Sequence, residues 1–393
     1  MNDITNKLKW YSITPIDVLL FRESKPFSPG DGSWAKGLFP PMPITVFHAL
    51  RSLLPHRSQP IEKNRDLNFL GVFLIDADDT VWVPTPKDLI LELTEIGADR
   101  KKAGQTWEST ECLQPTASDN AAWEDLLSSQ SNGKAMVPPP KFPIDKLGMP
   151  LPWIKATALE NYLQGKLPQK DENVFHADPW GIQILPHTQM KENQRQVKDE
   201  NGYFTEVAIR LKHGWKLLVG FTSPETFPIQ SVIRLGGEGH HAIVNPASQN
   251  INHQMQKILN YQKPNEFSTT AYLLTPGLAD VGTNLIDRGK TTPRYAAIPT
   301  EWETELQGCA TDRAILWGGI SKMSRRRSGE DIVQEREFTM LPQRAFVPPG
   351  SVYRFNARGD RPLTRLLPNA ENHSALQTFN SLNYGLLLWG THS

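Results

Sequence analysis

The sequence has too little cysteine for a disulfide framework. Its 393 residues include only Cys112 and Cys309, and their spacing does not match that of a zinc site. It also lacks a run of about 18 apolar residues that could span a membrane, and residues 1–9 lack the apolar core of a signal peptide. These absences argue against a disulfide-rich secreted domain and a transmembrane protein, and they predict a protein of the reducing cytoplasm.

The sequence has no excess of charge of either sign, with 42 basic and 42 acidic residues. A protein that binds nucleic acid over a wide surface by itself is usually basic overall. Any contact with nucleic acid is therefore expected to use local patches or the help of partner subunits. One region has the required local excess, because residues 321–365 hold ten Lys and Arg against five Asp and Glu.

The sequence contains no motif for catalysis or cofactor binding in a suitable context. Gly289-Lys290-Thr291 resembles the end of a phosphate-binding P-loop, but Asn284 stands where the first glycine is needed. The acidic turn Asp76–Asp79 could hold a cation, although hairpin turns favour aspartate for their own geometry. We therefore predict no catalytic residue, no metal and no cofactor.

The most informative stretch is a glycine loop, which has three glycines within four residues between two apolar segments. Glycine has no Cβ and tolerates positive φ, so the loop can bring backbone N–H groups close to a bound group. N–H groups that converge in a turn bind anions such as phosphate. The alternative is a tight β-turn in which the glycines only solve a backbone problem. The residues concerned are Gly236, Gly237 and Gly239, with Arg234, His240 and His241 as additional side-chain donors.

Apolar patterns predict regular elements along the rest of the chain. Residues 10–21 form an expected strand interrupted by Thr14-Pro15, and a long loop follows it. Pro43 suits the first position of a helix, whose apolar residues recur at helical spacing. The other predicted elements are a strand–turn–strand over 69–83, a β-hairpin over 204–221 around Lys212-His213-Gly214, and a helix over 252–261.

Residues 92–200 have the composition of an inserted, loop-rich segment. They are polar and include Pro138-Pro139-Pro140 and a charged run at 191–200. His176, Asp178 and His187 lie in this segment and could act as ligands, although scattered exposed histidines are more common.

The second half of the chain echoes the first. Ala271–Pro276 repeats the pattern of Trp10–Pro15, with tyrosine in second place and Thr-Pro at the end. Asn383-Tyr384-Gly385 forms a turn before an apolar strand, as the glycine loop does before Ala242–Val244. We interpret the halves as two copies of one βα-type unit.

Several blocks of sequence, in their order along the chain, resemble one protein family. The blocks are Thr14–Arg22 with Lys25-Pro26-Phe27, Phe39–Pro43 with Ala49-Leu50-Arg51, Arg234–His241, Tyr272–Leu278, Gly318-Gly319 and Val347–Phe355. Together they resemble the third Cmr subunit of type III-B CRISPR effector complexes, a family of RAMP proteins. In that family a basic residue often follows the last glycine of the central loop, and this chain has His240-His241 there. Residues 92–200 match the family least.

The resemblance implies an α+β fold with two ferredoxin-like domains, related to the RNA-recognition fold and enlarged by long loop insertions. The first domain would span 1–265, with the insertion at about 92–200, and the second would span 266–393. The resemblance also implies a non-catalytic subunit that binds the repeat-derived 5′ handle of the guide (CRISPR) RNA. It would dock to the large polymerase-like subunit and cap the filament of the backbone RAMP subunit.

Single-stranded RNA is held by phosphate contacts and by bases stacked on aromatic or arginine side chains. Three basic loops suit the phosphates, and Trp34 is either a stacking platform or a plug in a proline-rich loop. The predicted RNA-binding residues are Arg22, Lys25, Trp34, Lys36, Arg51, Arg234, Gly236, Gly237, Gly239, His240, His241, Lys322, Arg325, Arg326 and Arg327.

Two other functions stay open on the sequence alone. The chain could be a RAMP endoribonuclease that processes guide precursor, with His48, His240 or His241 as general base. It could also be a purely structural bridge between subunits, with its basic loops on acidic protein surfaces.

Overall fold

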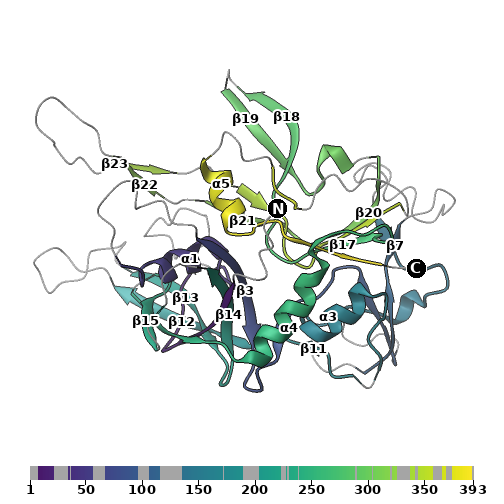
Figure 1. The fold of residues 1–393 in the computed structure, drawn as a ribbon, viewed down its shortest axis with the longest axis horizontal. Helices are drawn as coiled ribbons and strands as arrows, with labels where there is room; N and C mark the ends of the chain where they lie inside the picture. The colour runs from purple at the N-terminus through teal and green to yellow at the C-terminus, as the bar shows by residue number, and fades with distance from the viewer. Residues whose placement is uncertain are drawn as a thin grey trace, which may run out of the picture.

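The structure is a computed structural model, and it describes most of the chain. The described residues are 8–21, 34–35, 37–55, 67–95, 106–115, 135–170, 172–188, 203–222, 227, 230–237, 239–287, 290–302, 304–318, 321–324, 337–340, 344–356, 365–368 and 374–391. They form a strand-rich fold with short helices (Figure 1), which confirms the prediction of a fold that mixes helices and strands. In this part of the chain, no helix is long and apolar enough to cross a membrane.

The larger of the two main sheets has eight strands. They are β1 (Lys9–Pro15), β3 (Asn68–Ile75), β4 (Val81–Pro84), β10 (Trp153–Lys155), β11 (Phe175–His176), β14 (Lys216–Thr222), β15 (Ser231–Arg234) and β16 (His241–Pro246). Their order in space is β11-β10-β4-β3-β14-β1-β16-β15, and neighbouring strands are antiparallel. The predicted strand–turn–strand over 69–83 is confirmed as the β3–β4 pair.

Helix α1 (Pro43–Arg51) connects β1 to β3. It begins at Pro43, as predicted, because the fixed φ of proline suits the first turn of a helix. Ile44, Phe47 and Leu50 form its buried face. Because β1 and β3 are both antiparallel to β14, which lies between them, they run parallel to each other and α1 is their crossover.

The second main sheet has four strands, β17 (Thr270–Leu273), β20 (Leu306–Ala310), β25 (Val352–Phe355) and β26 (Leu387–Gly390), in the order β20-β25-β17-β26. If the four strands are numbered by their order along the chain, their order in space is second, third, first, fourth. The strands β3-β14-β1-β16 of the larger sheet have the same order. Helix α5 (Ser374–Ser381) connects β25 to β26. The sequence echo between 10–15 and 271–276 therefore falls on the two first strands, β1 and β17.

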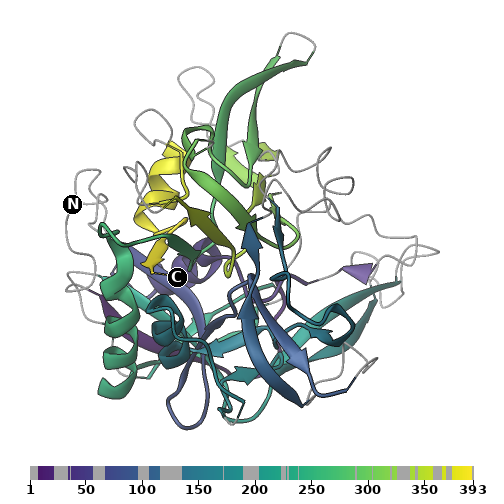
Figure 2. The same ribbon diagram turned by 90° about the vertical axis from the view of Figure 1, so that its right-hand side faces the viewer.

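Short sheets and helices surround the two main sheets. The sheets are β12 (Trp180–Thr188) and β13 (Tyr203–Leu211) with β2 (Trp34–Ala35); β5 (Leu89–Leu93) and β6 (Trp107–Cys112) with β9 (Leu147–Gly148); β7 (Gln114–Pro115) with β8 (Met136–Val137); β18 (Ala279–Asp287) with β19 (Lys290–Ala296); β21 (Ile315–Trp317) with β24 (Arg344–Phe346); and β22 (Ser321–Ser324) with β23 (Glu337–Met340). The remaining helices are α3 (Ala156–Leu163) and α4 (Gln249–Leu259), with 3₁₀ turns at Ile144–Lys146, Asn260–Gln262 and Thr300–Trp302. The β18–β19 hairpin projects from the body in both views (Figures 1 and 2).

The predicted β-hairpin over 204–221 is wrong. The two strands exist as β13 and β14, and a turn at Lys212–Trp215 connects them through a hydrogen bond from the Trp215 N–H to the Lys212 carbonyl. However, β13 pairs with β12 and β2, whereas β14 pairs with β1 and β3. The local signal marked the turn correctly, but the chain passes from one sheet to another there.

Residues 92–200 contain more regular structure than their polar composition indicates. They contribute β10 and β11 to the larger sheet, and also α3, whose Leu159 and Tyr162 side chains are fully buried. Buried apolar side chains in these elements, such as Ile154 and Leu159, form this structure although the segment as a whole is polar.

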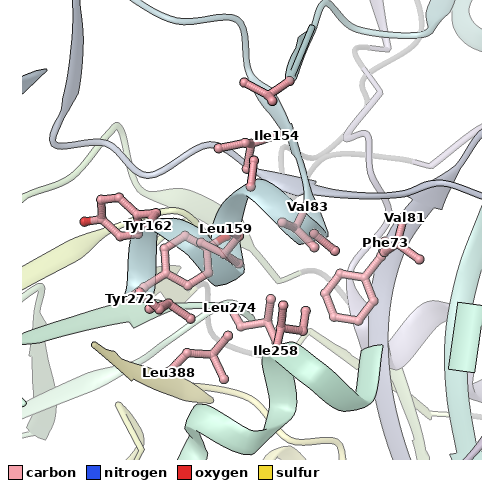
Figure 3. Close-up of a cluster of buried hydrophobic side chains, with 14 of the residues drawn as sticks. Phe73, Val81, Val83, Ile154, Leu159, Tyr162, Ile258, Tyr272, Leu274 and Leu388 are labelled. Atoms are coloured by element: carbon pink, nitrogen blue, oxygen red, sulfur yellow. The ribbon is translucent and has the colours of Figure 1, made fainter. Parts of the chain in front are cut away.

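The two main sheets share one apolar core. Side chains from α3 and α4 meet side chains of the second sheet in a single cluster, which includes Leu159, Ile258, Tyr272 and Leu388 (Figure 3). Helices α3 and α4 lie side by side over this cluster. The chain therefore folds its two halves against each other over a continuous buried surface.

A buried ion pair crosses between the halves inside this core. The Arg354 guanidinium donates to the Asp88 carboxylate at 2.7 Å and to the Thr270 hydroxyl at 2.8 Å. The Tyr162 hydroxyl donates to the same carboxylate at 2.8 Å, and burial raises its pKa well above the ordinary value. Asp88 has no solvent exposure, so its charge depends on these partners.

Replacing Arg354 with methionine should therefore destabilise the protein by about 3–5 kcal/mol, because it leaves the Asp88 carboxylate without its cation in a buried site. Urea unfolding followed by tryptophan fluorescence would measure the change. Lys87→Met is the matched control, since it removes the exposed Lys87–Asp312 pair, which is 3.1 Å apart, and should cost less than about 1 kcal/mol. Equal stability of the two variants would contradict this account.

Candidate nucleic-acid interface

The glycine loop joins β15 to β16 as a tight turn. The cross-strand pair Arg234–His241 comes just before it, and the Leu235 N–H donates to the His240 carbonyl at 2.8 Å. Gly236 and Gly239 have φ of 88° and 76°, which L-residues with a side chain rarely adopt. The loop thus requires glycine at these two positions for its backbone path.

The loop also packs closely on the segment that follows β1. The Gly237 N–H donates to the Leu20 carbonyl at 2.8 Å. A Cβ on Gly236 would lie 2.5 Å from that same carbonyl oxygen, which is closer than real Cβ contacts allow. The N–H groups of Gly236 and Gly239 have no hydrogen-bond partner among the described residues. The glycines therefore do solve a backbone problem in this turn.

A groove of about 690 Å³ opens beside the loop. Helix α1 forms one wall with Thr45, His48 and Ala49 and with its C-cap residue Ser52, and β15 forms another. The full lining is Leu20, Phe21, Leu38, Met42, Thr45, His48, Ala49, Ser52, Val232, Arg234, Gly236, Gly237 and Trp317. Because Trp317 comes from β21, both halves of the chain contribute to the groove.

Cationic and hydrogen-bonding groups gather at the rim of the groove. Arg234 is exposed, and His241 lies opposite it in the β15–β16 pair, so their side chains share a face. On α1, burial and the nearby positive charge of Arg51 lower the pKa of His48. The His48 imidazole is therefore neutral at pH 7 and has one donor and one acceptor nitrogen.

The structure brings several of the predicted RNA-binding residues together. Arg234, Gly236 and Gly237 line the groove, Arg51 lies next to His48, and Gly239, His240 and His241 belong to the adjoining loop. The predicted residues Arg22, Lys25, Lys36, Arg325, Arg326 and Arg327 lie outside the described residues. For Trp34 in β2 and Lys322 in β22 only the backbone is described.

Sequence reasoning missed the groove itself. Thr45, His48 and Ser52 form a second stripe on α1, at three- and four-residue spacing beside the apolar one, and this pattern was a usable signal. Trp317 had a weaker signal, its place just before Gly318-Gly319. Nothing in the local sequence indicated that it would line the same groove as α1.

The potential metal ligands serve other roles among the described residues. The Asp76 carboxylate accepts hydrogen bonds from the backbone of Asp78 and Thr80 and from the Trp82 indole. The Trp153 indole donates to Asp178 at 2.9 Å, while the ring of His176 packs against Trp82 and Trp215. The His187 side chain is not among the described ones. In the described part of the chain, no group of three or more His, Cys, Asp or Glu could hold a metal.

Comparison with known proteins gives one family match. Residues 11–392 match the family described as CRISPR-associated protein (Cas_Cmr3), which confirms the resemblance seen in the sequence. No curated protein matches the chain.

Solved structures of similar chains come from type III complexes. A chain of type III-B Cmr-beta bound to cognate target RNA is 11% identical, with a TM-score of 0.43, over 88% of this chain and 86% of that chain. The same coverage and identity hold for the complex that also contains AMPPnP, with a TM-score of 0.42. A chain of the Csm3-Csm4 subcomplex of the type III-A interference complex is 9% identical, with a TM-score of 0.33, over 88% and 92% of the two chains.

The two left-handed glycines of the loop should differ in their tolerance of substitution. Gly239→Ala should cost about 1–2 kcal/mol, because its φ is positive but an added Cβ meets no atom within 4 Å. Gly236→Ala should cost clearly more, because its Cβ would also meet the Leu20 carbonyl. Urea unfolding of both variants measures the difference, and equal losses would show that the loop does not pack on Leu20 as described.

Proposed function

Because this chain belongs to the CRISPR-associated Cas_Cmr3 family, we propose that it is a non-catalytic, guide-RNA-binding subunit of a type III-B effector complex. It binds the repeat-derived 5′ segment of the guide RNA. The observation that carries this proposal is the groove beside the glycine loop, where Arg234, the backbone of Gly236 and Gly237 and the stripe of polar residues along α1 converge.

The chemistry of this surface supports RNA as the ligand. Phosphates of single-stranded RNA bind cations and backbone N–H groups, and unstacked bases need apolar or aromatic surface. Arg234 in the lining and Arg51 near His48 supply the cations, while Leu20, Phe21 and Trp317 supply apolar lining. No carboxylate is among the lining residues in the described part of the chain, so none of these lining residues carries a charge that would repel a phosphate.

We extend this proposal to the partners of the chain and to further RNA contacts. Docking to the large polymerase-like subunit and to the backbone RAMP subunit, in the cytoplasm, follows from the family resemblance. Arg22, Lys25, Trp34, Lys36, Lys322 and Arg325 to Arg327 stay predicted contacts to the same RNA.

We propose that the two halves are ferredoxin-like domains, 1–265 and 266–393, with residues of about 92–200 inserted into the first. The shared strand order of the two main sheets supports this, as do α1 after the first strand of one and α5 before the fourth strand of the other. In the second half, the β18–β19 hairpin takes the place of a helix between the first two strands.

One observation favours a second candidate function, an endoribonuclease that processes guide precursor. The lowered pKa of His48 would keep its imidazole unprotonated and able to act as a general base at neutral pH. Against this function, no described carboxylate or lysine lines the groove as a partner acid. Metal-free cleavage of repeat RNA, lost in His48→Ala, would establish it.

The proposed function predicts specific crosslinks in the assembled complex. A guide RNA with photoreactive bases along its 5′ repeat-derived segment should crosslink to peptides that contain residues 43–55 or 230–246, because these form the groove. Efficient crosslinking to other subunits alone would favour the structural bridge, and a shortened RNA would favour the nuclease.

Arg234→Gln should weaken guide binding and reduce its salt dependence. With about five phosphate contacts, wild-type affinity should fall about a hundredfold between about 50 and 200 mM salt, at about 0.7 logarithmic units per contact. Losing one contact should reduce the slope of log affinity against log salt by about 0.7. Filter binding with the reconstituted complex measures both.

Lys257→Gln is the control for Arg234→Gln, because Lys257 is a half-exposed cation on α4 whose near partner is Glu160 at 4.0 Å. It should leave the salt slope unchanged. If both variants shift the slope equally, the effect is one of overall charge and Arg234 makes no specific phosphate contact.

A further inference from the structure

A second groove, of about 520 Å³, lies between the first residues of β1 and helix α4. It is at the end of β1 that is remote from the glycine loop. Pro15 pairs with Ala242 beside that loop, whereas Lys9, at the start of the strand, pairs with Phe221. At about 3.4 Å per residue, these two ends of β1 are about 20 Å apart. The second groove is therefore a separate surface from the proposed RNA interface.

Two aromatic residues in this groove are deeply buried, yet their polar atoms have no partner. Trp10 and Tyr11 are each 7% exposed. Neither the Trp10 indole N–H nor the Tyr11 hydroxyl has a hydrogen-bond partner among the described residues. Buried tyrosine and tryptophan side chains usually pair these atoms. Both residues line the groove, so a ligand bound there would supply the missing partners.

The packing of the two rings leaves these polar atoms available. The six-membered ring of Trp10 packs on β14, where a Cβ on Gly220 would lie 3.3 Å from it. The pyrrole end of the indole, which carries Nε1, is therefore the end remote from this contact. The ring of Tyr11 packs against Phe227, with the ring centroids 5.0 Å apart.

Helix α4 contributes two amide side chains to the facing wall. Asn252 and Gln256 are exposed and four residues apart, so they share one face of the helix. Four residues of helix rise by about 6 Å, and backbone groups on one edge of an extended peptide recur every two residues, at about 6.8 Å. Each amide has both donor and acceptor atoms. The pair therefore matches the N–H and C=O groups along one edge of an extended peptide.

The charge of the groove indicates what kind of peptide fits. Lys9 is exposed and is the only charged residue among the described residues that line the groove. In the part of the chain that the structure describes, it forms no ion pair. An acidic side chain of a partner is its electrostatic complement. RNA fits less well, because one lysine offers one phosphate contact and binding through phosphates gains its strength from several.

We propose that this groove binds an extended, acidic segment of another protein subunit of the same complex. The backbone of the segment lies along Asn252 and Gln256 and pairs with the polar atoms of Trp10 and Tyr11, while a carboxylate of the segment reaches Lys9. The inference goes beyond RNA binding, and it rests on the proposed place of the chain in a complex of several subunits.

Photocrosslinking in the reconstituted complex tests the proposal. One variant carries the photoreactive residue p-benzoylphenylalanine in place of Gln256. The matched control carries it in place of His253, which is exposed on the same helix but does not line the groove. The Gln256 variant should crosslink to one segment of another subunit, with Asp or Glu next to the crosslinked residue, and the His253 variant should not crosslink to that segment.

Other crosslinking results would overturn the proposal. Crosslinks from the Gln256 position to the guide RNA would make the groove part of the RNA interface, and crosslinks to a second copy of this chain would make it a self-association surface. A yield no higher than that of the His253 control would mean that no segment occupies the groove.

Reversing the charge tests the contact to Lys9. Lys9→Glu should weaken binding of the chain to a complex assembled without it by about tenfold, because it places like charges together. Biolayer interferometry measures this affinity. Changing the acidic residue of the crosslinked segment to lysine should restore most of the loss in Lys9→Glu. Lys212→Glu, which changes an exposed lysine outside the groove, should leave the affinity unchanged.

Equal affinities of Lys9→Glu and Lys212→Glu, or no recovery in the double reversal, would contradict the charge pair and with it the acidic segment. The proposed function is judged separately, by guide crosslinks to residues 43–55 or 230–246. If these persist while the second groove stays empty, only the docking proposal fails.

If guide crosslinks through this chain are lost while the Gln256 crosslink persists, only RNA binding fails.

Discussion

The position of α1, and with it one wall of the groove, depends on a turn near the other end of the chain. The Ile44 N–H, which belongs to the first turn of α1 and has no partner inside the helix, donates to the Tyr384 hydroxyl at 3.3 Å. The neighbouring Asn383 is fully buried, and its amide donates to the Phe69 carbonyl of β3 at 2.8 Å. One turn therefore satisfies both the start of α1 and the edge of the strand that follows it. Through these hydrogen bonds, the second half of the chain fixes the position of elements in the first half that form the groove.

The same turn explains the echo between the halves in physical terms. Gly385 has φ of 69°, and its N–H donates to the Pro276 carbonyl just after β17, as the Gly237 N–H donates to Leu20 after β1. In both halves the fourth strand begins with a glycine turn that packs on the segment after the first strand. In the second half this turn is buried by the first half, because Asn383 and Tyr384 are fully buried there. In the first half Gly236 and Gly239 remain exposed, so that turn is the one open to a ligand.

The local sequence was sufficient to predict those elements whose structure depends on neighbouring residues. Pro43 predicted the start of α1, the aspartate turn predicted the β3–β4 pair, and the glycines predicted a left-handed loop. Prediction failed where partners are distant in sequence. No feature of residues 204–221 indicates that β13 would join β12 while β14 joins β1, and the polar composition of 92–200 hides the buried Tyr162. The cationic half of the site was predictable because Arg234 adjoins the loop in sequence. The apolar half was not, because Trp317 joins the lining of the groove only through the packing of β21 with β24.

The balance of charge in the whole chain gives the apolar lining of the groove a particular importance. With 42 basic and 42 acidic residues, the protein cannot rely on a broad positive field to hold RNA, and the contribution of its few cations weakens as salt screens them. Contacts between a base and an apolar floor release no counterions, so they keep their strength as salt rises. A neutral protein that binds RNA partly through contacts to its bases would have lower affinity in total than a basic one. It would also bind nonspecific RNA weakly, because such RNA offers mainly phosphates. For the proposed function, neutral charge and an apolar groove are thus two parts of one solution to binding a defined RNA end.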